Sequence, residues 1–254
     1  MNKAATDSAI IQSVRDTLGK AEKKNRDTPR PAVTLSFAQS LDGCISVRKG
    51  APTAISNDQA MLITHQLRAM HNAILVGINT VLIDDPRLTV RYGDGDNPVP
   101  VVLDSQLRTP PDARLLQQDG AQPVIVALQD ASKELESRLV DAGARVVRTS
   151  RASGGGIQLT ELFRWLREHG LNSLMIEGGA KVISNVLAQG LCDQIVLIIA
   201  PRFFGCNGVR AAETLNCVRP TSSPCLARVK FLQLGDNMVV WGSMDPDDLA
   251  AADI

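Results

Sequence analysis

The stretch from Ala73 to Arg91 constrains the fold of this chain more strongly than any other part of the sequence. It begins with an unbroken apolar run, Ala73 to Val76, and such a run is typical of a strand that is covered on both faces. Gly77 follows at once and allows the backbone to turn where a side chain would clash. Because a strand of this kind needs helices on both sides of its sheet, the stretch predicts an α/β fold.

A polar segment follows this strand at the place where open α/β sheets bind ligands. Asn79 can cap a short helical turn, and Pro86 keeps the residue before it out of helical angles, so the turn is expected to end near Asp84. Asp84, Arg87 and Arg91 then lie beyond the carboxyl end of the strand. Their position predicts a binding site, and a solvated loop is the alternative.

Strands and helices alternate along most of the chain. Apolar or alternating runs predict strands at residues 33–38, 73–76, 98–105, 124–128, 145–148, 173–176 and 195–200, and helical periodicity predicts helices at 58–71, 132–142, 160–169 and 181–189. Two final strands, 229–234 and 238–241, are expected to form a hairpin. This order predicts a three-layer α/β fold with a mixed, mostly parallel sheet and a C-terminal antiparallel hairpin.

The sequence divides into three segments. Residues 1–30 are expected to stand apart from the fold, as an amphipathic helix that docks on a neighbour or subunit and a charged linker from Ala21 to Arg30. Residues 31–242 form the expected main domain, and 243–254 an acidic C-terminal tail. The apolar positions at helical spacing in the first segment are Ile10, Ile11, Val14 and Leu18.

Composition argues against several classes of protein. Lys plus Arg and Asp plus Glu both number 27, and this balance disfavours binding to nucleic acid or to an anionic membrane through bulk charge. No signal peptide and no membrane span are recognisable, so a cytoplasmic protein is expected. The five cysteines contain no C-x-x-C pair, which favours reduced thiols over disulfides or a metal site, and His65 is expected on a helix face.

A second signal for a site follows the strand at 173–176. The strand ends in Glu177-Gly178-Gly179 and leads into a helix, an order in which bare backbone N–H groups and the helix dipole can hold a phosphate. The G-x-G-x-x-G fingerprint of the Rossmann fold is missing, and a plain tight turn is the alternative. Glu177 is expected to face the same crevice as Asp84.

Four segments of the sequence together form a recognisable pattern. They are Ala38–Gly43, Thr64–Arg68 with Ala73–Arg91, Val102–Ser105, and Met175–Ala180 with Ala200-Pro201. The most specific part is Gly-x-x-Thr-Val-Leu-x-Asp-Asp-Pro-x-Leu-Thr-Val-Arg, which begins at Gly77. Over residues 31–242 the chain resembles the riboflavin-biosynthesis pyrimidine reductases, which are similar to the C-terminal reductase domain of RibD.

The resemblance implies a dihydrofolate-reductase-like fold, a homodimer, and NADPH-dependent reduction of a ribosylamino-pyrimidine 5′-phosphate to its ribitylamino counterpart. Hydride passes to C1′ of the opened sugar, and Asp84 and Glu177 are the candidates for positioning that centre and handling the proton. The positions that match cofactor contacts are Ala38, Thr80, Asp84, Ser105, Gly178, Gly179, Ala180, Lys181, Val182 and Ile183. Those that match substrate contacts are Arg68, Leu88, Arg91 and Glu177.

Two features of the sequence bear on the substrate. Pro52 stands where many bifunctional members carry a serine, so a hydroxyl contact there is lost. The zinc deaminase signature of those members, His-x-Glu with Pro-Cys-x-x-Cys, is absent. The motif sequences at residues 38–42, 64–68 and 176–183 are closer to those of the stand-alone fungal and archaeal reductases. The expected substrate is therefore 2,5-diamino-6-ribosylamino-4(3H)-pyrimidinone 5′-phosphate. Its deaminated counterpart is the alternative, and a dihydrofolate reductase or an inactive binding module is less favoured.

Overall fold

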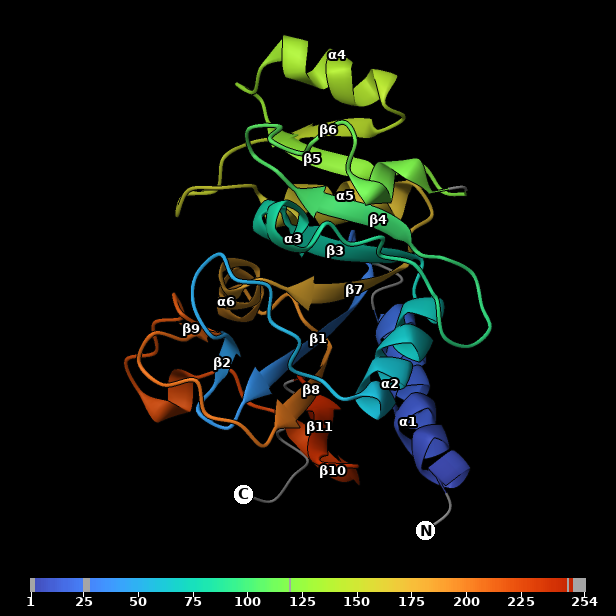
Figure 1. Cartoon of the computed structure of the whole chain (residues 1–254), viewed down its shortest axis with the longest axis vertical. Helices are drawn as coiled ribbons and strands as arrows, with labels where there is room; N and C mark the ends of the chain where they lie inside the picture. Colours follow the sequence, from blue (N-terminus) through green and yellow to red (C-terminus); the bar gives the residue numbers. More distant parts are fainter. Residues whose placement is uncertain (1–2, 25–27, 119, 246, 249–254) are drawn as a thin grey trace.

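The computed structural model describes residues 3–24, 28–118, 120–245 and 247–248, and within them nine strands form one sheet (Figure 1). The strand order is β10-β11-β8-β1-β7-β3-β4-β5-β6. All neighbours from β8 to β6 are parallel, whereas β11 is antiparallel to both β8 and β10, which confirms the predicted mixed sheet and C-terminal hairpin. The strands are β1 (Ala32–Ser40), β3 (Ala73–Gly77), β4 (Val99–Leu103), β5 (Val124–Leu128), β6 (Arg145–Thr149), β7 (Ser173–Gly178), β8 (Gln194–Ala200), β10 (Ala227–Leu234) and β11 (Asn237–Ser243).

Helices cover both faces of the sheet, as the alternation of elements predicted (Figure 1). One face carries α1, α2, α3 and α4, and the other carries α5 and α6. The helices are α1 (Lys3–Lys24), α2 (Asp58–Ala69), α3 (Ile78–Asp84), α4 (Lys133–Asp141), α5 (Leu159–Glu168) and α6 (Ala180–Ala188), with short 3₁₀ turns at Arg114–Gln117 and Pro220–Ser222. None of these helices has the length and apolarity that crossing a bilayer requires.

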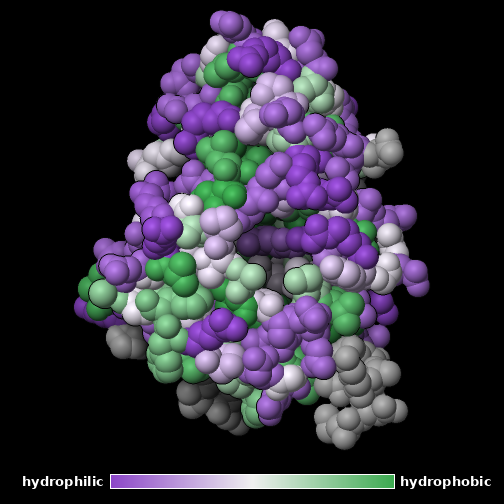
Figure 2. Space-filling view, in the orientation of Figure 1, coloured by the Kyte–Doolittle hydropathy of each residue, from purple (hydrophilic) through white to green (hydrophobic). Residues whose placement is uncertain are grey.

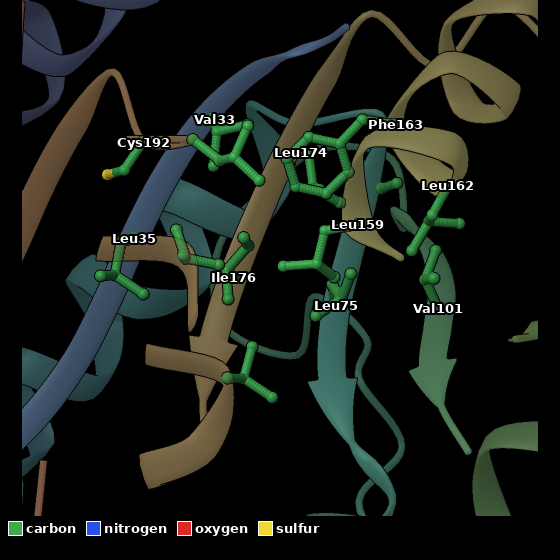
Figure 3. Close-up of a cluster of buried hydrophobic side chains, with 14 of the residues drawn as sticks. Val33, Leu35, Leu75, Val101, Leu159, Leu162, Phe163, Leu174, Ile176 and Cys192 are labelled. Carbon is green, nitrogen blue, oxygen red and sulfur yellow. The ribbon is translucent and has the colours of Figure 1, made fainter. Parts of the chain in front are cut away.

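The core explains why the strand that begins the stretch from Ala73 to Arg91 is apolar from Ala73 to Val76. In β3, Ile74 packs toward α3 and α4, whereas Leu75 packs toward α5 on the opposite face. Figure 3 shows the second of these clusters, where Leu75 lies close to Leu159 of α5, and Leu162 of the same helix lies close to Val101 of β4. Both faces of the strand are fully buried, so a polar residue at any of these positions would lose its water without compensation.

The N-terminal helix belongs to the packed body, in contrast to the expected separate segment. Ile10 and Val14 are fully buried against β8 and β11, and Val14 O accepts a hydrogen bond from Gln194 Nε2 at 3.3 Å. The helix also extends to Lys24, into the segment predicted as a linker, and Lys24 forms an ion pair with Asp245 at 2.7 Å. The apolar face of α1 therefore docks on the sheet of its own chain.

Two details also differ from the sequence prediction, and one segment is not described. Helix α3 begins at Ile78 after an N-terminal cap at Gly77, so the expected cap at Asn79 is wrong. The short strands β2 (Cys44–Ser46) and β9 (Val209–Arg210) pair in a second sheet that the sequence did not predict. Residues 246 and 249–254, most of the predicted acidic tail, lie outside the described residues.

Candidate active site

Four adjacent strands, β1, β7, β3 and β4, are parallel and end at the same edge of the sheet. The predicted cofactor positions follow these ends: Ala38 near the end of β1, Thr80 in α3 after β3, and Ser105 just after β4. All three side chains are half-buried. Figure 2 shows that the surface is hollowed near its centre, at the level of β7, between the part that carries α3 and the part that carries α2.

A glycine turn closes β7 and lies next to the start of α3. Gly178 has a φ of 101° and Gly179 a φ of 93°, a backbone that side chains rarely adopt. A Cβ at Gly179 would lie 3.9 Å from Thr80 Oγ1, and one at Gly77 would lie 3.2 Å from Val182 Cγ2. The turn, the start of α3 and the first turn of α6 therefore pack against one another.

Helix α6 offers backbone donors rather than a set of side chains. Ile183 donates its N–H to Gly179 O at 3.0 Å, so the N–H groups of Ala180, Lys181 and Val182 precede the first bond within the helix. The side chains of Val182 and Ile183 are buried in the core, and that of Lys181 is exposed. Of the predicted cofactor positions on this helix, Val182 can offer a ligand only its backbone, and the N–H of Ile183 is already used.

Asp84 is the last residue of α3, and its side chain is exposed at the surface. The surrounding chain still removes part of its solvent, and this burial raises the pKa of the Asp84 carboxyl above its ordinary value. Asp85 follows with a φ of 40° and donates its N–H to Val81 O at 3.0 Å, which ends the helix where the sequence predicted. Asp84 therefore binds a proton more readily than an ordinary aspartate.

Arg68 and Glu177 form a buried ion pair. Arg68 Nε donates to Glu177 Oε1 at 2.6 Å and Nη2 to Oε2 at 2.7 Å, while Nη1 donates to Thr89 O at 2.9 Å. Their side chains are only 10% and 15% exposed. The guanidinium fork that the sequence assigned to the substrate is thus bound to the predicted substrate carboxylate. Glu177, in turn, accepts two charge-assisted hydrogen bonds and is arranged as an acceptor.

The two other predicted substrate positions differ in where their side chains lie. Leu88 has a φ of 58°, and its side chain is buried in the core near α3, so it cannot offer a substrate an exposed apolar surface. Arg91 is exposed, and among the described residues its guanidinium forms no hydrogen bond or ion pair. Burial, and then the charges of Arg68 and Arg91, lower the pKa of the nearby His65 imidazole.

Comparison with known families identifies the group of proteins to which this site belongs. A family model described as the RibD C-terminal domain matches residues 31–240, almost the whole of the main domain. The chain belongs to this family. The resemblance inferred from the four sequence segments is therefore confirmed.

Members of the RibD C-terminal domain family differ in length. The chain is 41% identical over 184 residues to the 2,5-diamino-6-ribosylamino-4(3H)-pyrimidinone 5′-phosphate reductase of Methanothermobacter thermautotrophicus, covering 71% of this chain and 82% of that protein. It is 31% identical over 219 residues to the riboflavin biosynthesis protein RibD of Aquifex aeolicus, covering 84% of this chain but only 57% of that protein. Among solved structures, Acinetobacter baumannii RibD is 26% identical with a TM-score of 0.71, and the match covers 87% of this chain and 60% of that one.

Sequence reasoning missed two residues that shape this candidate site. His65, expected only as a helix-face residue, is 1% exposed and accepts the Arg91 N–H at its Nδ1, at 3.0 Å. Asn97 accepts the N–H of Val90 at 2.8 Å. The spacing of His65 and Arg68, three residues apart on one helix face, was the available signal for the first. The second had none, because a loop asparagine is common.

Proposed function

We propose that this protein reduces the ribosylamino side chain of 2,5-diamino-6-ribosylamino-4(3H)-pyrimidinone 5′-phosphate to a ribitylamino side chain, with NADPH as reductant. The geometric observation that carries the proposal is that two features lie at one edge of the sheet. One is the glycine turn after β7, and the other is the loop that carries the exposed Arg91 guanidinium. Glu177 directly precedes Gly178, and its ion pair with Arg68 links it to Thr89, two residues before Arg91. The name of the archaeal relative supports this choice of substrate.

The residues at the strand ends fit a nicotinamide dinucleotide. Gly179 leaves its backbone bare beside Thr80 Oγ1, and the first N–H groups of α6 have no partner within the helix, a combination suited to a pyrophosphate. Ala38, Thr80, Asp84, Ser105 and residues 178–183 would hold this cofactor. Val182 would contribute its backbone N–H, whereas Ile183, whose N–H is bonded to Gly179 O, packs beside Gly178. The cofactor supplies the hydride, and the choice of NADPH over NADH is part of the proposal.

The polar residues of the site have separate proposed roles in substrate binding and proton transfer. Arg91, exposed and unpaired among the described residues, binds the 5′-phosphate of the substrate. Glu177, which Arg68 holds as an acceptor, receives hydrogen bonds from donor groups of the substrate. Asp84 is better placed than Glu177 to handle a proton, because burial raises the pKa of its carboxyl and no arginine is paired with it among the described residues.

We further propose a homodimer, as the family resemblance implied. The face of β10 and β11 opposite α1 carries exposed apolar side chains, with Phe231 75% and Met238 39% exposed. Together with Leu41 and Pro201 these residues line a surface groove of about 460 Å³. A second copy of the chain that covered this face would remove the apolar surface from water.

The decisive test offers the purified protein NADPH with each of the two pyrimidines and compares kcat/KM. The diamino compound and its deaminated counterpart differ by an exocyclic amine against a carbonyl oxygen, and a mismatched group costs about 1–3 kcal/mol. We expect a clear preference for the diamino compound. A tenfold or larger preference for the deaminated compound would overturn the substrate assignment. NADPH oxidation with dihydrofolate alone would instead support a dihydrofolate reductase, and no NADPH oxidation with any of these compounds would support an inactive binding module.

A further inference from the structure

One face of α2 holds the loop that carries Arg91. His65, Arg68 and Ala69 share this face, because residues three and four apart on a helix are neighbours. Arg68 donates to Thr89 O at 2.9 Å, and His65 Nδ1 accepts from Arg91 N at 3.0 Å. Two buried side chains of α2 therefore fix the loop backbone at Thr89 and at Arg91.

Three further contacts bind this loop to α2 or to itself. The ring of Tyr92 meets the ring of His65 edge-on, with centroids 4.9 Å apart. Val90 donates its N–H to Asn97 Oδ1 at 2.8 Å. At Gly95, which has a φ of 133°, a Cβ would lie 2.6 Å from a side-chain carbon of α2, so the loop passes as close to the helix as glycine permits. The loop is thus held against α2 at several positions.

The contact at His65 depends on a neutral imidazole. Nδ1 can accept the Arg91 N–H only when its lone pair is free, with the ring proton on Nε2. Burial, and then the charges of Arg68 and Arg91, lower the pKa of His65 to about 4. The ring therefore remains an acceptor at neutral pH.

We propose that His65 is a positioning residue for substrate binding, which fixes the backbone from which the Arg91 guanidinium reaches the anionic group of the substrate. This inference rests on the proposed function, because it states how the same site places its arginine. The guanidinium of Arg91 forms no hydrogen bond or ion pair within the described part of the chain, so its backbone and rotamer set its direction. His65 is buried and acts through Arg91.

The kinetic test compares His65→Leu with His65→Asn. Leucine fills similar space but cannot accept a hydrogen bond, whereas the Asn amide oxygen can replace Nδ1 as the acceptor. We expect His65→Leu to raise KM for the phosphorylated pyrimidine about tenfold, with kcat and NADPH affinity within about twofold of wild type, and His65→Asn to stay within about threefold in KM. A fall in kcat as large as the rise in KM, seen in both variants, would indicate a general structural role and overturn the proposal.

A double variant tests whether His65 acts through Arg91. If it does, adding His65→Leu to Arg91→Ala should raise KM by no more than about twofold beyond Arg91→Ala alone. Full additivity of the two changes would overturn the proposal, because His65 would then affect binding without Arg91.

Amide hydrogen exchange gives a readout that does not depend on the substrate. His65→Leu should accelerate exchange of the Arg91 N–H about tenfold or more, and His65→Asn should not. An unchanged Arg91 amide would overturn the positioning role even if the enzyme is active. Wild-type protein that reduces neither pyrimidine would refute the proposed function and the substrate role of His65 with it, while accelerated exchange would still show that His65 holds the loop.

Discussion

Two arginines on the loop between α3 and β4 differ in their surroundings. Arg87 and Arg91 are both exposed, yet only Arg91 is fastened through its backbone to a buried histidine. We expect Arg91→Ala to raise KM for the phosphorylated pyrimidine by about 10- to 150-fold, because a charge-assisted contact contributes roughly 1.5–3 kcal/mol. Steady-state kinetics would measure the change. Arg87→Ala is the matched control and should leave KM near wild type; an equal rise there, or weaker NADPH binding in Arg91→Ala, would contradict the assignment.

Arg68 should behave differently from Arg91, although the sequence placed both at the substrate. Arg68→Ala leaves the buried carboxylate of Glu177 without its partner, and breaking a buried pair in this way costs about 3–5 kcal/mol of folding stability. Urea unfolding would measure the loss. Replacing both members, as in Arg68→Met with Glu177→Leu, should cost less than Arg68→Ala, since no uncompensated charge remains. A stable Arg68→Ala variant with only a raised KM would restore the sequence-based role.

The sequence assigned both Arg68 and Glu177 to the substrate, but did not predict that they pair with each other. Arg68 and Glu177 are 109 positions apart, and nothing local to either residue indicates that their charges meet. The direction of Leu88 was equally hidden, because a left-handed φ turns its side chain into the core. The proposed roles of Asp84, Glu177 and Arg91 in substrate and proton handling stay predictions.

Among the elements, the glycine turn before α6 offers the sharpest test. Gly179→Ala places a side chain where φ is 93°, a strain of about 1–3 kcal/mol, and also puts a methyl group beside Thr80 at the proposed pyrophosphate position. We expect weaker NADPH binding together with a lower Tm. Gly155→Ala, with a φ of 81° in an exposed loop, is the matched control for strain and should lower Tm alone. Unchanged NADPH affinity in Gly179→Ala would indicate a purely structural turn.

Most strands and helices of the main domain lie within a few residues of their predicted bounds, because their apolar periods are strong. The prediction failed where packing decides. Helix α3 starts at Ile78 because that side chain is buried in the core, which outweighs the capping preference of Asn79. Helix α1 continues to Lys24 because Ala21 is buried near Ala32, a contact that no local pattern contains.

A buried polar network connects α2 to α1 through β1 and β8. His71 Nδ1 lies 2.7 Å from Leu67 O and must donate to it, so Nε2 accepts from Thr34 Oγ1 at 2.8 Å. Gln194 Nε2 donates to the same hydroxyl at 2.9 Å and to Val14 O on α1. A charged His71 would donate from both nitrogens and break this order.

This network makes folding stability depend on pH. Burial lowers the pKa of His71 to about 4, below the value of about 6.5 in an unfolded chain, so the unfolded state binds more protons between these values. Stability is therefore complete above about pH 6.5 and falls on acidification, by about 1.4 kcal/mol for this group at about pH 5.5. Urea unfolding at about pH 7.5 and about pH 5.5 should show a smaller difference for His71→Gln than for wild type. His169→Gln, at an exposed histidine, should not change it; an unchanged difference in His71→Gln would refute His71 as the source of the acid sensitivity.

The proposed homodimer can be tested at the level of the whole molecule. Phe231→Glu puts a charge on the exposed face of the C-terminal hairpin and should shift the protein from dimer to monomer, because an unpaired charge is costly in an apolar contact. Light scattering across a dilution series would measure the shift. Val140→Glu, on α4 at the other end of the sheet, is the control and should remain dimeric (Figure 1). A wild-type monomer would exclude the dimer itself.

The central position of β1 has a consequence for the order in which the chain folds during synthesis. β1 lies between β7 and β8, so both of its partners are made only after residues 173–200 have left the ribosome. β3 to β6 can pair earlier, since they follow one another in sequence and in space. Helix α1 waits longer still for β11. Contacts between such distant segments slow folding. The first strand to be made therefore waits longest for its neighbours in the sheet, and its two unpaired edges give the nascent chain a particular need for protection from aggregation.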